Sequence, residues 1–256
     1  MLKSERKKLI LEELKQHKIV SLEKLVGLLD TSESTVRRDL DELESENKLR
    51  RVHGGAELPH SLQEEETIQE KSVKNLQEKK LIAQKAASLI KEKDVIFVDA
   101  GSTTAFLIKE LERKDITVVT NSIHHAVQLV DKQIPTVIIG GGVKMTTDAS
   151  IGGVALNQIN QLHFDRAFIG MNGVDEGYFT TPDMEEGAVK RAILENSKQT
   201  YVLADSSKIG QSCFAKVAPI KRAIVITSKG HELLSAIKEK TEVIEVLFIQ
   251  SHSIHL

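Results

Sequence analysis

The chain has 256 residues, of which 40% are hydrophobic and 28% are charged, and its formal net charge at pH 7 is −2. This balance is typical of a soluble globular protein with one or two domains, and it excludes a whole-chain electrostatic attraction to nucleic acid. Neither an apolar run of roughly 20 residues nor a signal-peptide core is evident, and the single cysteine, Cys213, excludes an intrachain disulfide, so we expect a cytoplasmic protein with no membrane partner.

The first 45 residues predict three short helices. Apolar side chains recur at helical spacing in three segments, which cover residues 3–16, 22–30 and 31–43. Ser21 and Ser32 are suitable N-caps for the second and third segments. A tight turn at Asp30-Thr31 joins these two, which is the helix-turn-helix arrangement in which the second helix reads DNA.

The third segment carries polar side chains opposite its apolar stripe. Hydroxyls and two arginines on one helical face suit a major groove, and they belong to Ser32, Ser34, Thr35, Arg37 and Arg38. The alternative is an ordinary solvated face on which Arg37 pairs with Glu33 and Asp41. We expect Asp39 to orient Arg38 or to cap structure.

A basic extended run follows the three helices and predicts a β-wing. Residues 48–56 include Arg50, Arg51 and His53, which we expect to meet phosphates or the minor groove, and the run ends in glycines that allow a tight turn. Residues 1–58 hold 12 Lys/Arg and 12 Asp/Glu, so non-specific DNA affinity should be modest and salt-dependent. We assign 1–58 to a winged helix-turn-helix domain and the polar residues 59–79 to a linker.

Residues 80–250 predict an α/β domain. Short apolar runs typical of buried strands alternate with helical patterns, and the expected strands cover residues 95–98, 116–119, 136–139, 166–169, 200–203, 223–226 and 243–249. Strands that alternate with helices imply a largely parallel sheet covered on both faces. Ligands of such sheets bind at the carboxyl ends of the strands.

Small and polar residues stand at three successive strand ends. The first expected strand runs into a glycine and hydroxyls that open a helix, a cradle suited to phosphate or carboxylate, and these candidates are Asp99, Gly101, Ser102, Thr103 and Thr104. Asn121 follows the second strand, and Gly141 and Gly142 follow the third. Tight turns also select such residues, but their common topological position favours one shared small-ligand pocket.

Two later clusters add charged candidates. Asp175, Glu186 and Lys208 are expected to recognise sugar hydroxyls and a phosphate charge. The alternative readings are a helix cap at Asp183 or Thr181 and a solvated surface charge at Lys208.

These motifs resemble the DeoR family of bacterial sugar regulators. The N-terminal likeness rests on Arg6, Ile10 and Leu14, on Ser32-x-x-Thr35-Val36-Arg37-Arg38-Asp39-Leu40, and on Arg51-Val52-His53-Gly54-Gly55-Ala56. The C-terminal likeness rests on Asp99-x-Gly101-Ser102-Thr103, Thr120-Asn121, Gly140-Gly141 and Leu203-Ala-Asp-Ser-Ser-Lys208. The resemblance implies a sensor domain similar in fold to ribose-5-phosphate isomerase. Within the family the chain looks most similar to fructose-operon repressors, which implies fructose 1-phosphate as effector.

We therefore expect a repressor of a sugar-utilisation operon. It would bind double-stranded operator DNA as a homo-oligomer and leave it when a phosphorylated sugar binds. The rival reading is a sugar-phosphate isomerase fused to a DNA-binding domain, with Asp175, Glu176 or Glu186 as the base. The isomerases' lysine and glycine run does not recur, so we expect no catalysis. The scattered histidines give no convincing metal ligand set, and we expect no cofactor.

Overall fold

A computed structural model describes the chain except for residues 18, 47, 53, 59–61 and 248–256. The polypeptide divides into two compact units, Met1–Ser61 and Leu62–Leu256. Among the described residues, no helix combines the length and the apolarity that crossing a bilayer requires.

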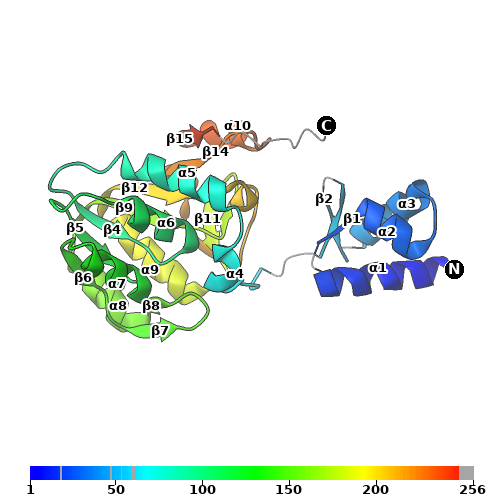
Figure 1. The fold of residues 1–256 in the computed structure, drawn as a ribbon, viewed down its shortest axis with the longest axis horizontal. Helices are drawn as coiled ribbons and strands as arrows, with labels where there is room; N and C mark the ends of the chain where they lie inside the picture. Colours follow the sequence, from blue (N-terminus) through cyan, green and yellow to red (C-terminus); the bar gives the residue numbers. More distant parts are fainter. Residues whose placement is uncertain (18, 47, 53, 59–61, 248–256) are drawn as a thin grey trace. The chain divides into compact units, whose positions relative to one another are not determined.

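The N-terminal unit is a winged helix-turn-helix. It contains three helices, α1 (Lys3–His17), α2 (Leu22–Leu29) and α3 (Glu33–Ser45), which confirm the predicted order (Figure 1). A three-stranded antiparallel sheet has the order β1-β3-β2, with β1 (Ile19–Ser21), β2 (Arg50–Val52) and β3 (Gly55–Glu57). The helices bury their apolar stripes in one core, which includes Ile10, Leu14, Leu25, Leu29, Val36, Leu40 and Leu43.

The wing depends on its two glycines for different reasons. Gly54 has a φ of +81°, the left-handed region that side chains disfavour. A Cβ on Gly55 would lie 2.2 Å from the Val20 carbonyl oxygen, because β1 pairs closely against β3 at this point. The wing is thereby tied to the helices through β1, where Ile19-Val20 could be expected to begin a short extended segment.

The C-terminal unit is built on a seven-stranded sheet whose paired neighbours are all parallel. Its order is β15-β14-β12-β9-β4-β5-β6, and the strands are β4 (Val95–Val98), β5 (Thr117–Thr120), β6 (Thr136–Ile138), β9 (Phe164–Gly170), β12 (Ser197–Leu203), β14 (Ile224–Ser228) and β15 (Val243–Val246). The predicted α/β class and parallel sheet are confirmed.

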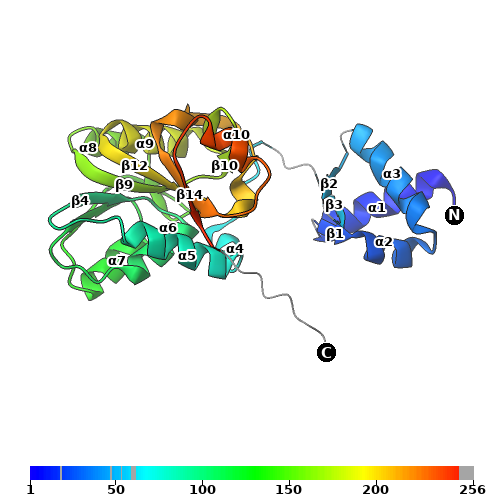
Figure 2. The ribbon, with the colours of Figure 1, turned by 90° about the horizontal axis from the view of Figure 1, so that it is seen from above.

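Helices cover both faces of this sheet, as Figure 2 shows. One face carries α5 (Leu76–Ala87), α6 (Ser102–Glu110) and α7 (Ile123–Asp131); the other carries α8 (Gly152–Ile159), α9 (Met184–Glu195) and α10 (Leu234–Lys238). Side chains of β4 alternate between the two cores: Phe97 packs with α8 and α9, and Ile96 and Val98 pack with α5 and α6. Burial on both faces explains why the strands read as continuous apolar runs.

Several small elements were not predicted. They are the hairpin β7 (Gly142–Lys144) and β8 (Ala149–Ile151), the helix α8, the short helix α4 (Ile68–Ser72), and an antiparallel sheet of β10 (Gly173–Val174), β11 (Tyr178–Thr181) and β13 (Ala215–Pro219). Their strands span two to five residues, too few to show a clear period in the sequence.

The predicted linker of residues 59–79 is wrong from Leu62 onward, since these residues belong to the second unit. The Leu62 carbonyl accepts from Phe214 N at 2.9 Å, and Ile68 N donates to the Thr146 carbonyl at 2.8 Å. We call residues 62–75 the strap. Its polar composition resembles that of a linker, but long-range hydrogen bonds fix it to the rest of the second unit.

Candidate DNA-binding face and effector pocket

The start of α3 is organised by Ser32. Its hydroxyl caps the helix by accepting from Thr35 N at 3.3 Å, and it lies 3.0 Å from the Ser34 hydroxyl and 2.8 Å from that of Thr35. Val36, Leu40 and Leu43 point into the core. The same helix therefore presents hydroxyls at its N-terminal end, where a recognition helix contacts base edges.

The two arginines of α3 differ in their partners. Arg37 donates to the Glu33 carboxylate from Nε at 2.9 Å and from Nη2 at 2.6 Å, which is the pairing expected of a solvated face. Arg38 is exposed and makes no ion pair with any residue that the structure describes. The Arg38 guanidinium is therefore not held by any described carboxylate, whereas that of Arg37 is held by Glu33.

The wing arginines are paired with carboxylates as well. Arg50 Nε donates to Glu57 at 2.6 Å, and Arg51 donates through Nη1 to Asp41 of α3. The Arg51 backbone N–H donates to Glu44 at 2.7 Å, so the wing is held against the recognition helix. His53, a further predicted contact, lies outside the described residues.

Asp39 has a structural role that differs from the expected one. Its carboxylate is 1% exposed and accepts from Arg6 of α1, from Nε at 2.6 Å and from Nη2 at 3.2 Å. The expectation that Asp39 orients Arg38 is wrong, because both carboxylate oxygens face α1. This bidentate pair fixes α1 against α3.

In the second unit, one pocket lies at the carboxyl ends of the central strands. It is lined by residues from the strap, the β4–α6 turn and the start of α6, the β7–β8 turn, the end of β9 and the residues after it, α9, and the end of β12 with the segment that follows. These residues are Glu65, Ile68, Lys71, Ala100, Gly101, Ser102, Thr103, Thr147, Gly170, Met171, Asn172, Glu186, Lys190, Leu203, Asp205 and Lys208. This is the position at which parallel α/β sheets bind ligands.

The β4–α6 turn supplies an anion cradle. No side chain caps α6 at Gly101, so the first N–H groups of the helix have no acceptor one turn back. The side chains of Ser102 and Thr103 are beside them in the pocket lining. Unpaired N–H groups at the positive end of a helix dipole, flanked by hydroxyls, favour a phosphate.

Lys71, Lys190 and Lys208 line the pocket, and of these three Lys208 is the one without an ion pair to a described residue. It ends a 3₁₀ turn, η1 (Ser206–Lys208), whose cap Asp205 accepts from Ser207 N at 3.1 Å. Lys208 is half-buried. A bound phosphate would give it a partner.

Behind the cradle lies a buried ion pair between Lys190 of α9 and Asp99 at the end of β4. Lys190 is 5% exposed and Asp99 1%. Burial alone would lower the pKa of Lys190, but the charges of Asp99 and Glu186 outweigh burial and raise it above the ordinary lysine value. Lys190 therefore stays charged inside the pocket, and Asp99 also accepts from Gly170 N at 3.3 Å.

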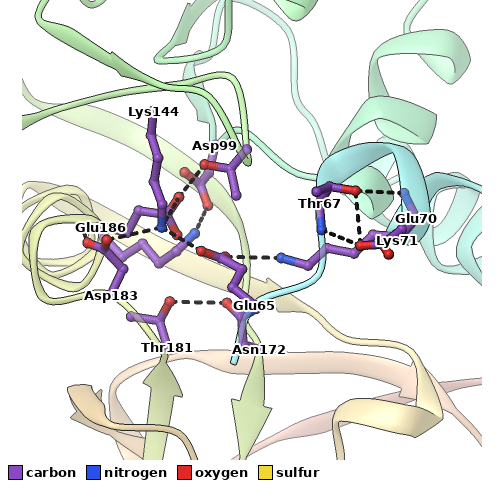
Figure 3. Close-up of polar contacts among 12 residues, drawn as sticks. Glu65, Thr67, Glu70, Lys71, Asp99, Lys144, Asn172, Thr181, Asp183 and Glu186 are labelled. Carbon is purple, nitrogen blue, oxygen red and sulfur yellow. Dashed lines mark hydrogen bonds and ion pairs between the residues drawn. The ribbon is translucent and has the colours of Figure 1, made fainter. Parts of the chain in front are cut away.

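A second ion network joins the strap to the pocket wall, as Figure 3 shows. Glu65 accepts from Lys71 at 3.1 Å and also binds Lys144, whose ammonium lies 3.1 Å from Asp183 and 3.6 Å from Glu186. Burial would raise the pKa of Glu65, yet the charges of Lys71 and Lys144 keep it below the usual range. Glu65 is therefore an anion held among lysines.

Besides Asp99, which lies behind the cradle, five predicted effector residues do not line the pocket. Thr104 is fully buried and donates to the Gly101 carbonyl at 2.9 Å, and Asn121 accepts from Ala100 N at 2.9 Å, so both support the cradle from behind. Gly141 and Gly142 lead into β7, away from the pocket lining. Asp175 ties a turn by accepting from Gly177 N at 2.7 Å and Tyr178 N at 2.6 Å. We therefore leave Gly141, Gly142 and Asp175 out of the proposed site.

Sequence reasoning missed Lys190, Lys144 and the strap residues Glu65 and Lys71. The position of Lys190 could have been predicted from the sequence, because it stands one turn after Glu186 and three residues before Ile193, on the buried face of α9. Those of Glu65 and Lys71 could not, because nothing local distinguishes them from the other charges of a polar segment.

The two units together define a class of protein: a ligand-responsive transcription regulator with a winged helix-turn-helix and an α/β sensor domain. The DeoR-like helix-turn-helix family matches residues 6–62, and the DeoR C terminal sensor domain family matches residues 74–229. The chain belongs to the DeoR family of transcriptional regulators.

Named relatives extend over nearly the whole chain. The uncharacterized HTH-type transcriptional regulator FruR from Bacillus subtilis (strain 168) is 43% identical over 95% of this chain and 98% of its own length. The HTH-type transcriptional repressor GlcR from the same organism is 36% identical over 90% of each chain. These names indicate a regulator rather than an enzyme. Ribose 5-phosphate isomerase A from Methanocaldococcus jannaschii, 21% identical, covers 51% of this chain and 53% of that one with a TM-score of 0.39, which carries no functional conclusion.

Proposed function

We propose that this protein is a cytoplasmic repressor of a sugar-utilisation operon, that of fructose, and that it binds its operator as a homo-oligomer and is released by fructose 1-phosphate. The observation that carries the effector proposal is that one pocket brings together the uncapped start of α6 and Lys208, which makes no ion pair with a residue that the structure describes. The name of the Bacillus subtilis relative and the repressor name of GlcR support fructose and repression.

In this proposal the phosphate binds the cradle, and the sugar hydroxyls bind the polar side chains further along the pocket. Ser102, Thr103 and the first N–H groups of α6 donate to phosphate oxygens, and Lys208 neutralises part of the charge. Asn172, Glu186 and Asp205 supply acceptors for hydroxyl groups. Lys190 stays paired with Asp99 and holds α9 against the end of β4.

The strap is the element that we expect to carry the signal. It begins at Leu62, directly after the N-terminal unit, and its Glu65, Ile68 and Lys71 line the pocket. A dianion near Lys71 competes with Glu65 for that lysine, so an occupied pocket favours a different strap position. Such a shift can change operator affinity only if the effector binds the two strap positions unequally.

The direct test of the effector begins with an operator-like duplex selected from a random DNA pool by the purified protein. Release of this duplex is then titrated with fructose 1-phosphate, fructose 6-phosphate, glucose 6-phosphate, free fructose and inorganic phosphate. We expect fructose 1-phosphate to act at the lowest concentration. If only another sugar phosphate released the duplex, the fructose assignment would be rejected, but the proposal that the pocket binds a sugar phosphate would stand.

Lys208→Met tests the cradle, and Lys221→Met, at an exposed lysine outside the pocket lining, is its matched control. A lost charge-assisted hydrogen bond is worth about 1.5–3 kcal/mol, so Lys208→Met should need more than about tenfold more effector. The control should respond as the native protein does. Equal responses of the two variants would place the phosphate elsewhere.

Glu65→Gln tests the strap. We expect tighter effector binding by calorimetry, because the competing carboxylate is gone, together with a smaller effect of effector on DNA affinity. Glu66→Gln, in the same strap but paired with the exposed Lys74, is the control. If the effector changed the DNA affinity of Glu65→Gln by the same factor as that of the native protein, the proposed role of the strap would be contradicted.

The alternative function is a sugar-phosphate isomerase. Two of its three candidate bases do not line the pocket: Asp175 ties a turn, and Glu176 lies 3.6 Å from Lys240. The third, Glu186, is hydrogen-bonded by Thr147 and faces Lys144. Incubation of the purified protein with pentose and hexose phosphates should give no isomerised product, and turnover above background would overturn the regulator-only reading.

A further inference from the structure

A face of α7 exposes apolar side chains. Ile123, Val127 and Val130 recur at i, i+4 and i+7, which places them on one side of the helix, and they are 40%, 57% and 64% exposed. The opposite side of α7 buries Leu129 and His125 in the domain. Both faces of this helix are therefore largely apolar, although only one meets the core.

Exposed apolar side chains also occur on the edge strand β6 and on α8. Val137 and Ile138 of β6 are 45% and 47% exposed, and Val154 of α8 is 60% exposed. The strand β6 ends the sheet order, pairing only with β5 among the described strands. The α7 helix packs against β6 on one face of the sheet, and α8 lies on the other face, where Gly140 N, in the segment after β6, donates to Gln158 of α8 at 3.1 Å (Figure 2). The exposed side chains therefore flank this edge of the sheet from both sides. We call these six exposed side chains the β6 face.

The β6 face lies in a part of the chain with few charges. Residues 116–163 contain four Asp, Glu, Lys or Arg residues, whereas the whole chain is 28% charged. Three of the four are engaged: Lys132 donates to backbone carbonyls, Lys144 binds Glu65, and Asp148 lies 3.2 Å from His124. Depletion of charge is the compositional mark of an interface core.

The area of the β6 face matches a protein partner. Its six fractional exposures correspond to roughly 500 Å² of apolar surface, at the upper end for a monomer, where the largest patch is about 300–600 Å². A standard interface buries about 800 Å² on each partner, of which about 56–65% is apolar. The face thus supplies about the apolar area that one such interface needs. A lipid surface would call for flanking lysines and arginines, which are absent from the face.

We propose that the β6 face is the surface on which a second copy of this chain packs, in a two-fold symmetric dimer of sensor domains. A two-fold interface brings the same patch of both copies together, so it must be self-complementary, as an uncharged apolar face is. The need for two copies rests on the proposed function, because one recognition helix reads too few bases. The location of the interface rests on the exposed side chains alone.

The test measures association of the full chain by sedimentation velocity across a concentration series, without DNA or effector. Val130→Lys places a charge in the last turn of α7, inside the β6 face. Val73→Lys is the matched control, because Val73 is 72% exposed at the C-terminal cap of α4 and lies outside the face. Ile138→Lys on β6 is a second variant, and thermal melts establish that each one folds.

We expect the native protein to be a dimer. Val130→Lys and Ile138→Lys should each raise the dissociation constant of this dimer by about tenfold or more, because the new charge would be buried against its symmetry mate. Val73→Lys should leave the dissociation constant unchanged. A monomeric native protein, or folded Val130→Lys and Ile138→Lys variants that associate normally, would overturn the proposal. Equal weakening by Val73→Lys would also overturn it. Because no effector or operator is present, failure of the effector assignment leaves this result unaffected.

Discussion

The two candidate sites of this protein are built in opposite ways. The DNA-binding face comes from residues 32–51, close together in the chain, and its arginines are exposed or paired with nearby acids. The effector pocket draws on residues from Glu65 to Lys208, and its central pair, Lys190 and Asp99, is buried. Charged side chains at the first site are exposed to solvent and can change partners, whereas those at the second site are buried in the folded domain.

The largest expected effect comes from breaking the buried pair. Lys190→Met leaves the Asp99 carboxylate without its cation, and removing one partner of a buried pair costs about 3–5 kcal/mol. Urea unfolding should show this loss of stability. The double variant Lys190→Met with Asp99→Leu should recover much of it. A loss below about 1 kcal/mol in the single variant would mean that the pair does not hold α9 to β4.

A smaller effect is expected from the buried histidine behind the cradle. Desolvation lowers the pKa of His125 to about 4, against the backbone hydrogen bond with Gly101 that raises it. Because its folded pKa lies below the unfolded value of 6.5, the unfolded chain binds more protons between these values, so stability is full above pH 6.5 and falls as pH decreases toward 4.

Between pH 7 and pH 5 this histidine should remove about 2 kcal/mol of stability. The measurement is urea unfolding at both pH values for the native protein and for His125→Gln. The variant should lose less stability between them. An equal loss in both proteins would assign the pH dependence to other groups.

On the DNA-binding face the expected differences are finer. Arg38→Ala should weaken binding to the selected duplex by about 1–3 kcal/mol. Arg37→Ala should cost less, because Arg37 gives up Glu33 when it binds DNA. Arg113→Ala, at an exposed pair with Asp115 in the sensor domain, serves as the control. If Arg37→Ala and Arg38→Ala lost the same DNA affinity in a binding assay, the proposed difference between the two arginines would be wrong.

The smallest effect concerns Glu33 itself. Glu33→Gln removes the carboxylate that holds Arg37 and one negative charge at the start of α3. DNA binding should tighten by a few tenths of a kcal/mol, comparable with an exposed i,i+4 pair. Arg37→Ala should abolish this gain in the double variant. A gain that persists without Arg37 would point to general repulsion of DNA by Glu33.

The same contrast explains what could be predicted from the sequence. Helix stripes, caps and the basic wing are local patterns, so the helix-turn-helix and its polar face were predictable, as were the strands of the parallel sheet. The cradle residues Gly101, Ser102 and Thr103 were predictable because one short motif holds them. Lys144 and Glu65 were not, since only tertiary packing brings a hairpin strand and a linker-like segment to one pocket. Gly141 and Asp175 failed for the converse reason: their residue types suited a pocket, but their local turns explain them.

The central claim is that a phosphorylated sugar in the α6 cradle controls release of DNA, and Gly101→Val tests it most directly. A Cβ at this position would lie 3.1 Å from the Thr104 hydroxyl, so a branched side chain crowds the cradle, and the substitution changes no residue of the DNA-binding unit. The measurement is release of the selected duplex as fructose 1-phosphate is added to each protein. We predict that Gly101→Val binds the duplex with native affinity and stays bound at concentrations that release the native protein. Native-like release of Gly101→Val would contradict the account.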